Sequence, residues 1–400
     1  MAKTTNAAST VISIDMRHGA IHYYSMPKGE GETAVHHVRG FAAPIFSEEF
    51  NMRFREVLAE FSEAEPSEDV RRVTLVVPDE AVALDHFRLP AMRSARQMEK
   101  ALDAKLSTIY ENRAELRVKS AIVDKNKQYV TYAVAAIRKY IVDDLYAACS
   151  ENHMLALGLT TASAAAVMAA AGLLPALGRE NYLFLDIKDT YARYTFVVGG
   201  RASGGYTLPF GLEFLREGKY VQEDMLFDHT LGELTVLNAR ERARAKKLTM
   251  LEEIGATAAA EDDEDAPTLT VEEAPEGAKR DGVRYLPKKT PRKLPQYMLR
   301  EIPTDREGIT CENFRVFLKW GLGLLRSNAA VTALGIPKEV VVNLPPELSY
   351  VLDSVNAEEK ENGIPFVRLS AADAVGELAT ALELVGGVMD VKGNATVLRF

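Results

Sequence analysis

Two aspartates occupy matching places in the sequence, and their surroundings are those of a phosphate- and metal-binding turn. Asp15 ends the apolar run Val11 to Asp15, and Asp186 ends the apolar run Tyr182 to Asp186. A second run with strand-like composition follows each aspartate after a short turn. Such a turn holds a phosphate when small residues let the backbone N–H groups approach closely. In the first turn, however, Arg17 stands where the loop needs glycine.

The segments around Asp15 follow a β-β-β-α-β order. Val11 to Asp15, Ala20 to Ser25 and Ala34 to Val38 have the composition of short strands, and residues 51–64 have the apolar spacing of a helix. Val73 to Pro78 is a continuous apolar run, which is typical of a strand buried on both faces. This order begins a ribonuclease-H-like or actin-like domain.

The same order begins again at residue 182, where Gly199 and Gly200 supply the turn into a third strand. Two halves of this kind, facing each other across a cleft, are what an actin-like fold needs. The sequence therefore predicts an α/β protein with an actin-like (ribonuclease-H-like) duplicated two-domain fold. We expect it to carry an inserted small α+β module and a charged, disordered insertion.

The predicted domain boundaries follow from these segments. Residues 1–78 form the first part of the first actin-like domain, residues 79–154 the inserted module, and residues 155–180 the return to the first domain. Residues 181–400 form the second domain, with a C-terminal helix that returns to the first. Within the second domain, blocks of like charge at about residues 238–303 have few large apolar residues, which predicts a flexible insertion.

Composition excludes several classes of protein. A net charge of -9 and a pI near 5.5 argue against a protein that coats nucleic acid. Two cysteines, far apart in sequence, do not make a disulfide framework or a four-ligand zinc site, and the first residues have no secretory signal. We therefore expect a cytoplasmic protein. The segment from Leu155 to Leu177 is long enough to span a membrane, but its small residues predict a strand and a buried helix.

Two longer phrases carry a family resemblance. The first is VVPDEAVALDHFRLPAMRSARQMEKALDAKL, in the inserted module, and the second is YAVAAIRKYIVDDLYAACSENHMLALGLTTASAAAV, which leads back to the first domain. Both resemble the PilM-like family of type IV pilus assembly proteins, relatives of the division protein FtsA in the actin-like ATPase superfamily. The cytoplasmic part of GspL-type secretion proteins is similar too.

The resemblance implies a cytoplasmic scaffold that is peripheral at the inner face of the cytoplasmic membrane. Its implied partner is a PilN-like bitopic inner-membrane protein, whose short cytoplasmic segment docks on the actin-like body. The resemblance also implies self-association of the protein. It implies neither binding of nucleic acid nor a membrane-spanning segment in this chain.

The family binds nucleotide at three loops, and this sequence departs from the family pattern in all of them. The first loop keeps Asp15 but has Arg17 for glycine, and the second keeps Asp186 but has Lys188 for glycine, with Thr190 as a displaced hydroxyl. At the third, where a Gly-Gly pair would lie against adenosine, the chain has Asn343 followed by leucine and two prolines. We therefore predict a degenerate nucleotide cleft, with no catalytic residues and weak or lost ATP binding.

Two hypotheses remain for the cleft. In the first, Arg17 and Lys188 pair with Asp15 and Asp186, where metal and phosphate would neutralise each other in an active ATPase. The alternatives for the two cations are that they bind an anionic ligand or that they are exposed turn residues. In the second, the protein is an active ATPase that binds Mg-ATP, with both aspartates positioning the metal through water and Thr190 near the phosphates.

Other candidate chemistry is weaker. His36 and His37 are adjacent, so they point to opposite faces of a strand and do not share a metal ion. Cys149 and His153 lie four residues apart on a predicted helix, but two ligands without a third favour ordinary packing. The basic stretch Lys288 to Lys293 is predicted to be a solvated linker, with contact to acidic lipid or to a partner as the alternative.

Overall fold

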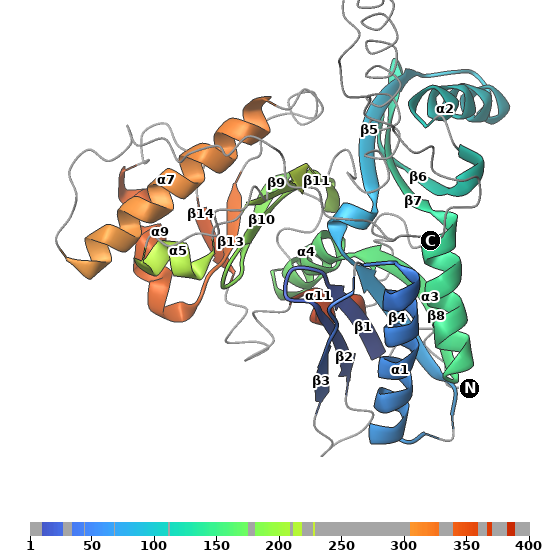
Figure 1. Ribbon diagram of the computed structural model, residues 1–400. Coiled ribbons are helices and arrows are strands. Elements are labelled where there is room, and N and C mark those ends of the chain that lie inside the picture. Colours follow the sequence, from blue (N-terminus) through green and yellow to red (C-terminus); the bar gives the residue numbers. More distant parts are fainter. Residues whose placement is uncertain are drawn as a thin grey trace, which may run out of the picture.

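The computed structural model describes most of the chain outside the termini and the charged insertion (Figure 1). The described residues are 10–26, 34–43, 45–67, 69–110, 113–174, 181–208, 211–217, 227–228, 305–327, 339–358, 366–369 and 382–388. The predicted charged insertion at 238–303 and the basic stretch at 288–293 lie outside these residues.

The first half of the molecule is built on a sheet with the strand order β3-β2-β1-β4-β8. Strands β1 (Thr10–Asp15), β2 (Ala20–Ser25) and β3 (Val35–Gly40) form an antiparallel meander. Strands β4 (Arg71–Val77) and β8 (Met154–Thr161) then extend the sheet in parallel. The carboxyl ends of β1 and β4 therefore meet at one edge of the sheet, which is where the candidate site lies.

Two helices cover one face of this sheet. Helix α1 (Glu48–Ala64) begins at Ser47, whose hydroxyl accepts a hydrogen bond from the N–H of Phe50, and it buries a phenylalanine-rich face. Helix α3 (Lys139–Glu151) packs beside α1 in the same core. The sequence analysis had included residues 139–151 in the inserted module. Their apolar residues face the first sheet instead, so α3 serves as the crossover into β8.

The inserted module is a three-stranded antiparallel sheet with the order β5-β7-β6. It consists of β5 (Ala83–Pro90), β6 (Leu116–Lys125) and β7 (Tyr129–Arg138), with helix α2 (Ala95–Ile109) packed on one face. A short helix, η1 (Asp79–Ala81), joins β4 to this module. The module therefore leaves the first half directly beside the carboxyl end of β4.

The second half repeats the topology of the first. Its sheet has the order β12-β11-β10-β9-β13-β14, in which β11-β10-β9-β13-β14 matches β3-β2-β1-β4-β8 strand for strand. The strands are β9 (Tyr182–Ile187), β10 (Ala192–Val198), β11 (Arg201–Leu208), β12 (Phe227–Asp228), β13 (Val340–Asn343) and β14 (Phe366–Leu369). Helices α5 (Leu212–Glu217), α7 (Arg306–Ser327) and α9 (Ser349–Glu358) cover one face. The predicted duplication is confirmed at the level of strand order.

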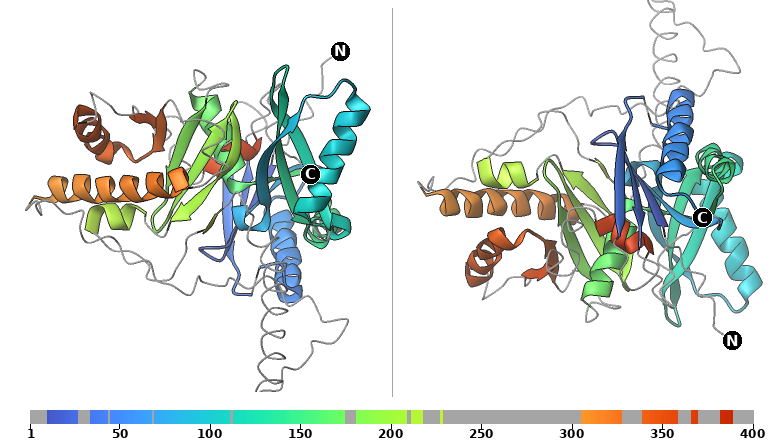
Figure 2. Two further views of the ribbon diagram at one scale, coloured as in Figure 1. Left: turned by 90° about the horizontal axis from the view of Figure 1, so that it is seen from above. Right: turned by 90° about the horizontal axis from the view of Figure 1, so that it is seen from below.

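Two helices made largely of small and apolar residues lie between the two sheets (Figures 1 and 2). Helix α4 (Ala162–Leu173) follows β8, and helix α11 (Leu382–Val388) is the C-terminal helix that the sequence analysis expected to return to the first domain. The two helices approach so closely that a Cβ on Gly386 would lie 1.7 Å from the carbonyl oxygen of Ala165. A side chain at this position would push α11 away from α4.

The apolar segment at residues 155–177 is a strand followed by a buried helix in its described part, as predicted. Within the described part of the chain, no helix is both long enough and apolar enough to cross a membrane.

Candidate functional site

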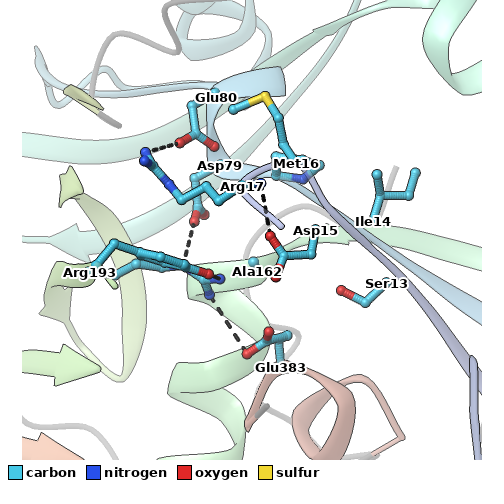
Figure 3. A pocket seen from close by; sticks show the side chains of 12 residues that line it. Ser13, Ile14, Asp15, Met16, Arg17, Asp79, Glu80, Ala162, Arg193 and Glu383 are labelled. Carbon is cyan, nitrogen blue, oxygen red and sulfur yellow. Dashed lines mark hydrogen bonds and ion pairs between the residues drawn. The ribbon is translucent and has the colours of Figure 1, made fainter. Parts of the chain in front are cut away.

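The candidate site lies where two hairpin loops, one from each half, face each other. The first loop, residues 16–19, joins β1 to β2, and the second loop, residues 188–191, joins β9 to β10. Both loops follow an aspartate of the first strand in their sheet, because the two halves share one topology. Figure 3 shows that side chains from the first loop, η1, β10 and α11 point toward one another here.

The first loop is closed by its own aspartate. The carboxylate of Asp15 accepts hydrogen bonds from the backbone N–H of Arg17 at 2.9 Å and from the N–H of His18 at 3.2 Å. Gly19 has a positive φ of 58°, and a Cβ there would lie 2.7 Å from the carbonyl oxygen of Phe41. The N–H groups that a phosphate would need are thus already bonded to a carboxylate.

His18 completes the first loop and reaches the second. Its Nδ1 lies 2.7 Å from Oδ2 of Asp15, and its Nε2 lies 3.5 Å from the hydroxyl of Thr190. The hydrogen bond with Asp15 raises the pKa of His18, against the opposing effect of burial. Burial in turn acts to raise the pKa of the Asp15 carboxyl, but the hydrogen bonds and charge of His18 outweigh it and hold that pKa below its usual range. The Asp15 carboxylate and a protonated His18 therefore each favour the charged form of the other.

The side chain of Arg17 pairs with Glu80, whereas the sequence analysis expected a pair with Asp15. Its guanidinium donates to the carboxylate of Glu80 at 2.9 Å, with both side chains nearly buried (Figure 3). Glu80 follows β4, the parallel neighbour of β1, so its side chain is close to the first loop. The backbone N–H groups of the loop hydrogen-bond to Asp15, and the side chain of Arg17 contacts the carboxylate of Glu80 instead.

Lys188 and Asp186 form the predicted ion pair in the second half. The ammonium of Lys188 lies 3.1 Å from Asp186 and 3.0 Å from Glu383 on α11, and its side chain is only 5% exposed. Burial acts to raise the pKa of Glu383, but the positive charges of Lys188 and Arg193 hold that pKa below its usual value. A buried lysine thus lies between two carboxylates, one on each side of the cleft.

Arg193 is a site residue that the sequence analysis missed. It lies on β10 directly across the hairpin from Asp186, and its guanidinium comes within 3.8–3.9 Å of Asp79, Asp186 and Glu383. Burial acts to lower the pKa of Arg193, but its acidic neighbours outweigh burial and raise that pKa well above its usual value. Its register opposite Asp186 was the signal in the sequence, since a hairpin pairs residues at fixed distance from the turn.

Tyr191 lies between the two arginines. Its ring centroid is 5.0 Å from the guanidinium carbon of Arg17 and 5.4 Å from that of Arg193, and its hydroxyl accepts a hydrogen bond from Arg193 at 2.9 Å. Burial raises the pKa of this hydroxyl, so the ring stays neutral. One aromatic side chain therefore bridges a cation from each half.

Asp79 anchors the site to helix α4. Its carboxylate accepts hydrogen bonds from the backbone N–H of Ser163 at 3.0 Å and from the Ser163 hydroxyl at 2.9 Å. The carboxylate thus binds the N-terminal turn of α4, where the helix dipole favours negative charge. Neither Asp79 nor Glu80 was predicted, although both directly follow a buried strand.

Asn343 lies at the carboxyl end of β13 and supports the second half of the site. Its side-chain amide donates to Asp186 at 2.9 Å, and both residues are buried. Of the predicted residues, Asp186, Lys188 and Asn343 therefore form one group. Asp15 is joined to Thr190 through His18, and Arg17 belongs to a separate pair with Glu80.

The pocket between these side chains is small, with a volume of about 20 Å³. Ligand pockets have volumes of roughly 300–1,000 Å³, and one water needs roughly 10–15 Å³. This space suits a water molecule. Among the described residues, no group of three or more His, Cys, Asp or Glu side chains is arranged to hold a metal ion.

Comparison with known proteins adds a shared fold. No protein-family model and no curated protein matches the sequence. A chain of the PilM-PilN type IV pilus biogenesis complex matches 96% of this chain and 100% of its own length, with 14% sequence identity and a TM-score of 0.53. The cytoplasmic domain of EpsL, an inner membrane component of the type II secretion system of Vibrio cholerae, matches 53% of this chain and 79% of its own, with 13% identity and a TM-score of 0.34.

A third match is the ethanolamine utilization protein EutJ from Carboxydothermus hydrogenoformans. It covers 95% of this chain and 89% of its own, with 11% identity and a TM-score of 0.35. Together with the repeated strand order, the match with the chain of the PilM-PilN complex shows that this chain has the predicted actin-like fold.

Proposed function

We propose that this protein is a non-catalytic, PilM-like scaffold for the assembly of a type IV pilus or a related envelope machine. In this proposal it works in the cytoplasm, peripheral at the inner face of the cytoplasmic membrane. Its partner is a PilN-like bitopic inner-membrane protein, whose cytoplasmic segment it binds. The observation that carries the proposal is the match with a chain of the PilM-PilN complex over 96% of this chain.

The loss of nucleotide binding is part of this proposal, and the site supports it. Lys188 and Arg193 place positive charge between the carboxylates of the cleft, where an Mg-nucleotide would bring its own charges. Asp15 binds the N–H groups of its own loop, and the remaining space is that of a water molecule. A nucleotide would have to displace several buried ion pairs before it made any contact of its own.

Calorimetric titration of Mg-ATP into the full-length protein tests the nucleotide part. We expect no binding heat and no rise in melting temperature at millimolar Mg-ATP, because the N–H groups of Arg17 and His18 in the first loop are already bonded to Asp15. An Asp15→Asn variant serves as the control. Micromolar binding that this variant abolishes would contradict the proposal and favour the active Mg-ATP-dependent ATPase.

Fractionation of cells tests the scaffold part separately. We expect the protein to sediment with inner membranes when a PilN-like bitopic protein is present, and to become soluble when that protein is deleted. Membrane association that is independent of every bitopic component of the pilus or secretion machine would contradict the proposed partner.

A further inference from the structure

We propose that Lys188, Tyr191 and Arg193 form a latch that holds the two halves of this protein closed without a nucleotide. The latch consists of these three residues of the second half together with Arg17, Asp79 and Glu383, which they contact. The inference rests on the proposed loss of nucleotide binding and adds the conformational consequence. Proteins with two halves around a cleft close when a bound ligand bridges the halves, and here side chains of the chain make the bridge.

Lys188 provides the first connection. Its ammonium is shared between Asp186, on its own sheet, and Glu383, on α11. Helix α11 packs on the first sheet, where Leu384 joins the core around Val11 and where a Cβ on Gly387 would lie 2.6 Å from the Val11 side chain. The position of Glu383 is therefore fixed by the first sheet, and Lys188 joins the second hairpin loop to it.

Arg193 and Tyr191 provide the second connection. Arg193 comes within 3.8 Å of Asp79, which is held in place by the N-terminal turn of α4. The ring of Tyr191, also from the second half, lies against Arg17 of the first loop at 5.0 Å. Arg17 is fixed in turn by Glu80. Each contact across the cleft thus ends on a side chain that a second interaction already orients.

The charges of the latch and of its partners Glu80 and Asp186 nearly balance. Three cations, Arg17, Lys188 and Arg193, are placed among four carboxylates, Asp79, Glu80, Asp186 and Glu383. The N-terminal turn of α4 offsets part of the charge of Asp79. With all its members present, the cluster is close to neutral. Removing one cation leaves the buried carboxylates with an excess of negative charge, and opening the cleft is the simplest way to hydrate them.

Distance measurements between two spin labels test the latch. Met52→Cys on α1 and Asp353→Cys on α9 place exposed labels on opposite halves, while the native cysteines Cys149 and Cys311 are buried. Pulsed electron spin resonance on the labelled full-length protein then gives the interhalf distance. We expect a single distance population in the absence of nucleotide, unchanged by Mg-ATP.

The latch variants are Lys188→Met and Arg193→Gln, each in the labelled background. We expect both to lose the single population and to show a second, displaced one. The matched control is Arg53→Gln, which removes an arginine that also contacts two carboxylates, Glu56 and Glu60, but within one half and on the surface. We expect it to keep the distribution of the parent. Should a latch variant fail to fold, Arg193→Lys takes its place in the distance measurement. This variant keeps the positive charge and loses the stacking of the guanidinium on Tyr191.

Each outcome separates the latch from the proposed function. A single population in the folded latch variants would overturn the latch and assign closure to the packing of α4 and α11. Several populations in the parent that Mg-ATP leaves unchanged would overturn the latch and leave the proposed function standing. Several populations that Mg-ATP collapses into one would overturn both.

Discussion

The two hairpin loops have the same place in the fold, but their aspartates differ in burial and in partners. In the first half, the side chain of Asp15 is 14% exposed and is occupied by the backbone and the histidine of its own loop. In the second half, Asp186 is 1% exposed and lies against a buried lysine, a buried asparagine and a buried arginine. Duplication has thus produced one aspartate that is bound within its own loop and one that belongs to a cluster of charges extending across the cleft.

This difference shows that topology fixes where the two loops lie but not what they bind. The two sheets share one strand order, and Asp15 is the last residue of β1 while Asp186 is the last but one of β9. In the first loop the residue two positions later, Arg17, turns to its own half. In the second loop the equivalent Lys188 reaches α11. The second loop should therefore contribute more to the stability of the closed protein, and variants in each loop test that comparison.

The largest effect is expected for Lys188→Met in the second loop. Methionine keeps the length of the side chain but leaves Asp186 and Glu383 buried with only the guanidinium of Arg193, 3.8–3.9 Å away, as a cation. The free energy of unfolding should fall by about 3–5 kcal/mol, as for other buried pairs that lose one partner. Chemical denaturation with circular dichroism measures this.

Arg53→Met is the control for that variant. Arg53 contacts two carboxylates, but on the surface of α1, so its loss should cost less than about 1 kcal/mol. Equal losses for the two variants would mean that the burial of Lys188 has no energetic consequence.

The sequence predicted the fold well because the strand pattern is strong and repeated. Alternating and continuous apolar runs placed the strands of both sheets, and Gly199 and Gly200 marked a turn in which both have positive φ, 57° and 75°. The role of residues 139–151 was not predictable in the same way. An amphipathic helix shows which of its faces is buried, but its sequence does not show which of two neighbouring sheets will cover that face.

The candidate site was predictable only where its partners are close in sequence or on neighbouring strands. Asp186 and Lys188 are two residues apart at the end of one strand, so their pairing follows from strand geometry. Glu383 lies 195 residues from Lys188, and only the packing of α11 on the first sheet brings it there. The position of Glu80 beside the first loop could have been predicted, because β1 and β4 are parallel neighbours and their carboxyl ends meet.

The second largest effect is expected for Arg17→Met in the first loop. Glu80, 5% exposed, would lose its charged partner, and Tyr191 would lose one of its two cations. Hydrogen bonds to charged groups contribute about 1.5–3 kcal/mol, so the loss should be smaller than for Lys188→Met. Denaturation under the same conditions gives the comparison directly. A cost for Arg17→Met equal to or above that of Lys188→Met would invert the proposed asymmetry.

A smaller, pH-dependent effect is expected for His18→Gln. The folded protein raises the pKa of His18, so its contribution to stability is fully present below the unfolded pKa of about 6.5 and is lost as pH rises through the folded pKa. Because the side chain is 44% exposed, solvent screening keeps the contribution small. The melting temperature of the variant should therefore fall furthest below that of the parent near about pH 5.5, and the gap should narrow toward alkaline pH.

His22→Gln provides a control with the opposite sign. Burial lowers the pKa of His22, so the unfolded chain takes up a proton that the folded protein resists, and stability is lost as pH falls through the unfolded pKa. The stability of this variant relative to the parent should therefore increase as the solution becomes acidic. Parallel pH profiles for the two histidine variants would show that the contact between His18 and Asp15 does not set the charge of the first loop.

The smallest effect is expected for Thr190→Val in the second loop. The only contact across the cleft that the structure gives this hydroxyl, among the described residues, is the 3.5 Å approach to His18, which is exposed. Stability should change by less than about 0.5 kcal/mol, as for other surface substitutions. The same variant also separates the two hypotheses for the cleft, because an active ATPase would need this hydroxyl near the phosphates. A melting temperature that rises with Mg-ATP in the parent but not in Thr190→Val would show that the second loop holds nucleotide, and its charges would then belong to a ligand site and not to a bridge between the halves.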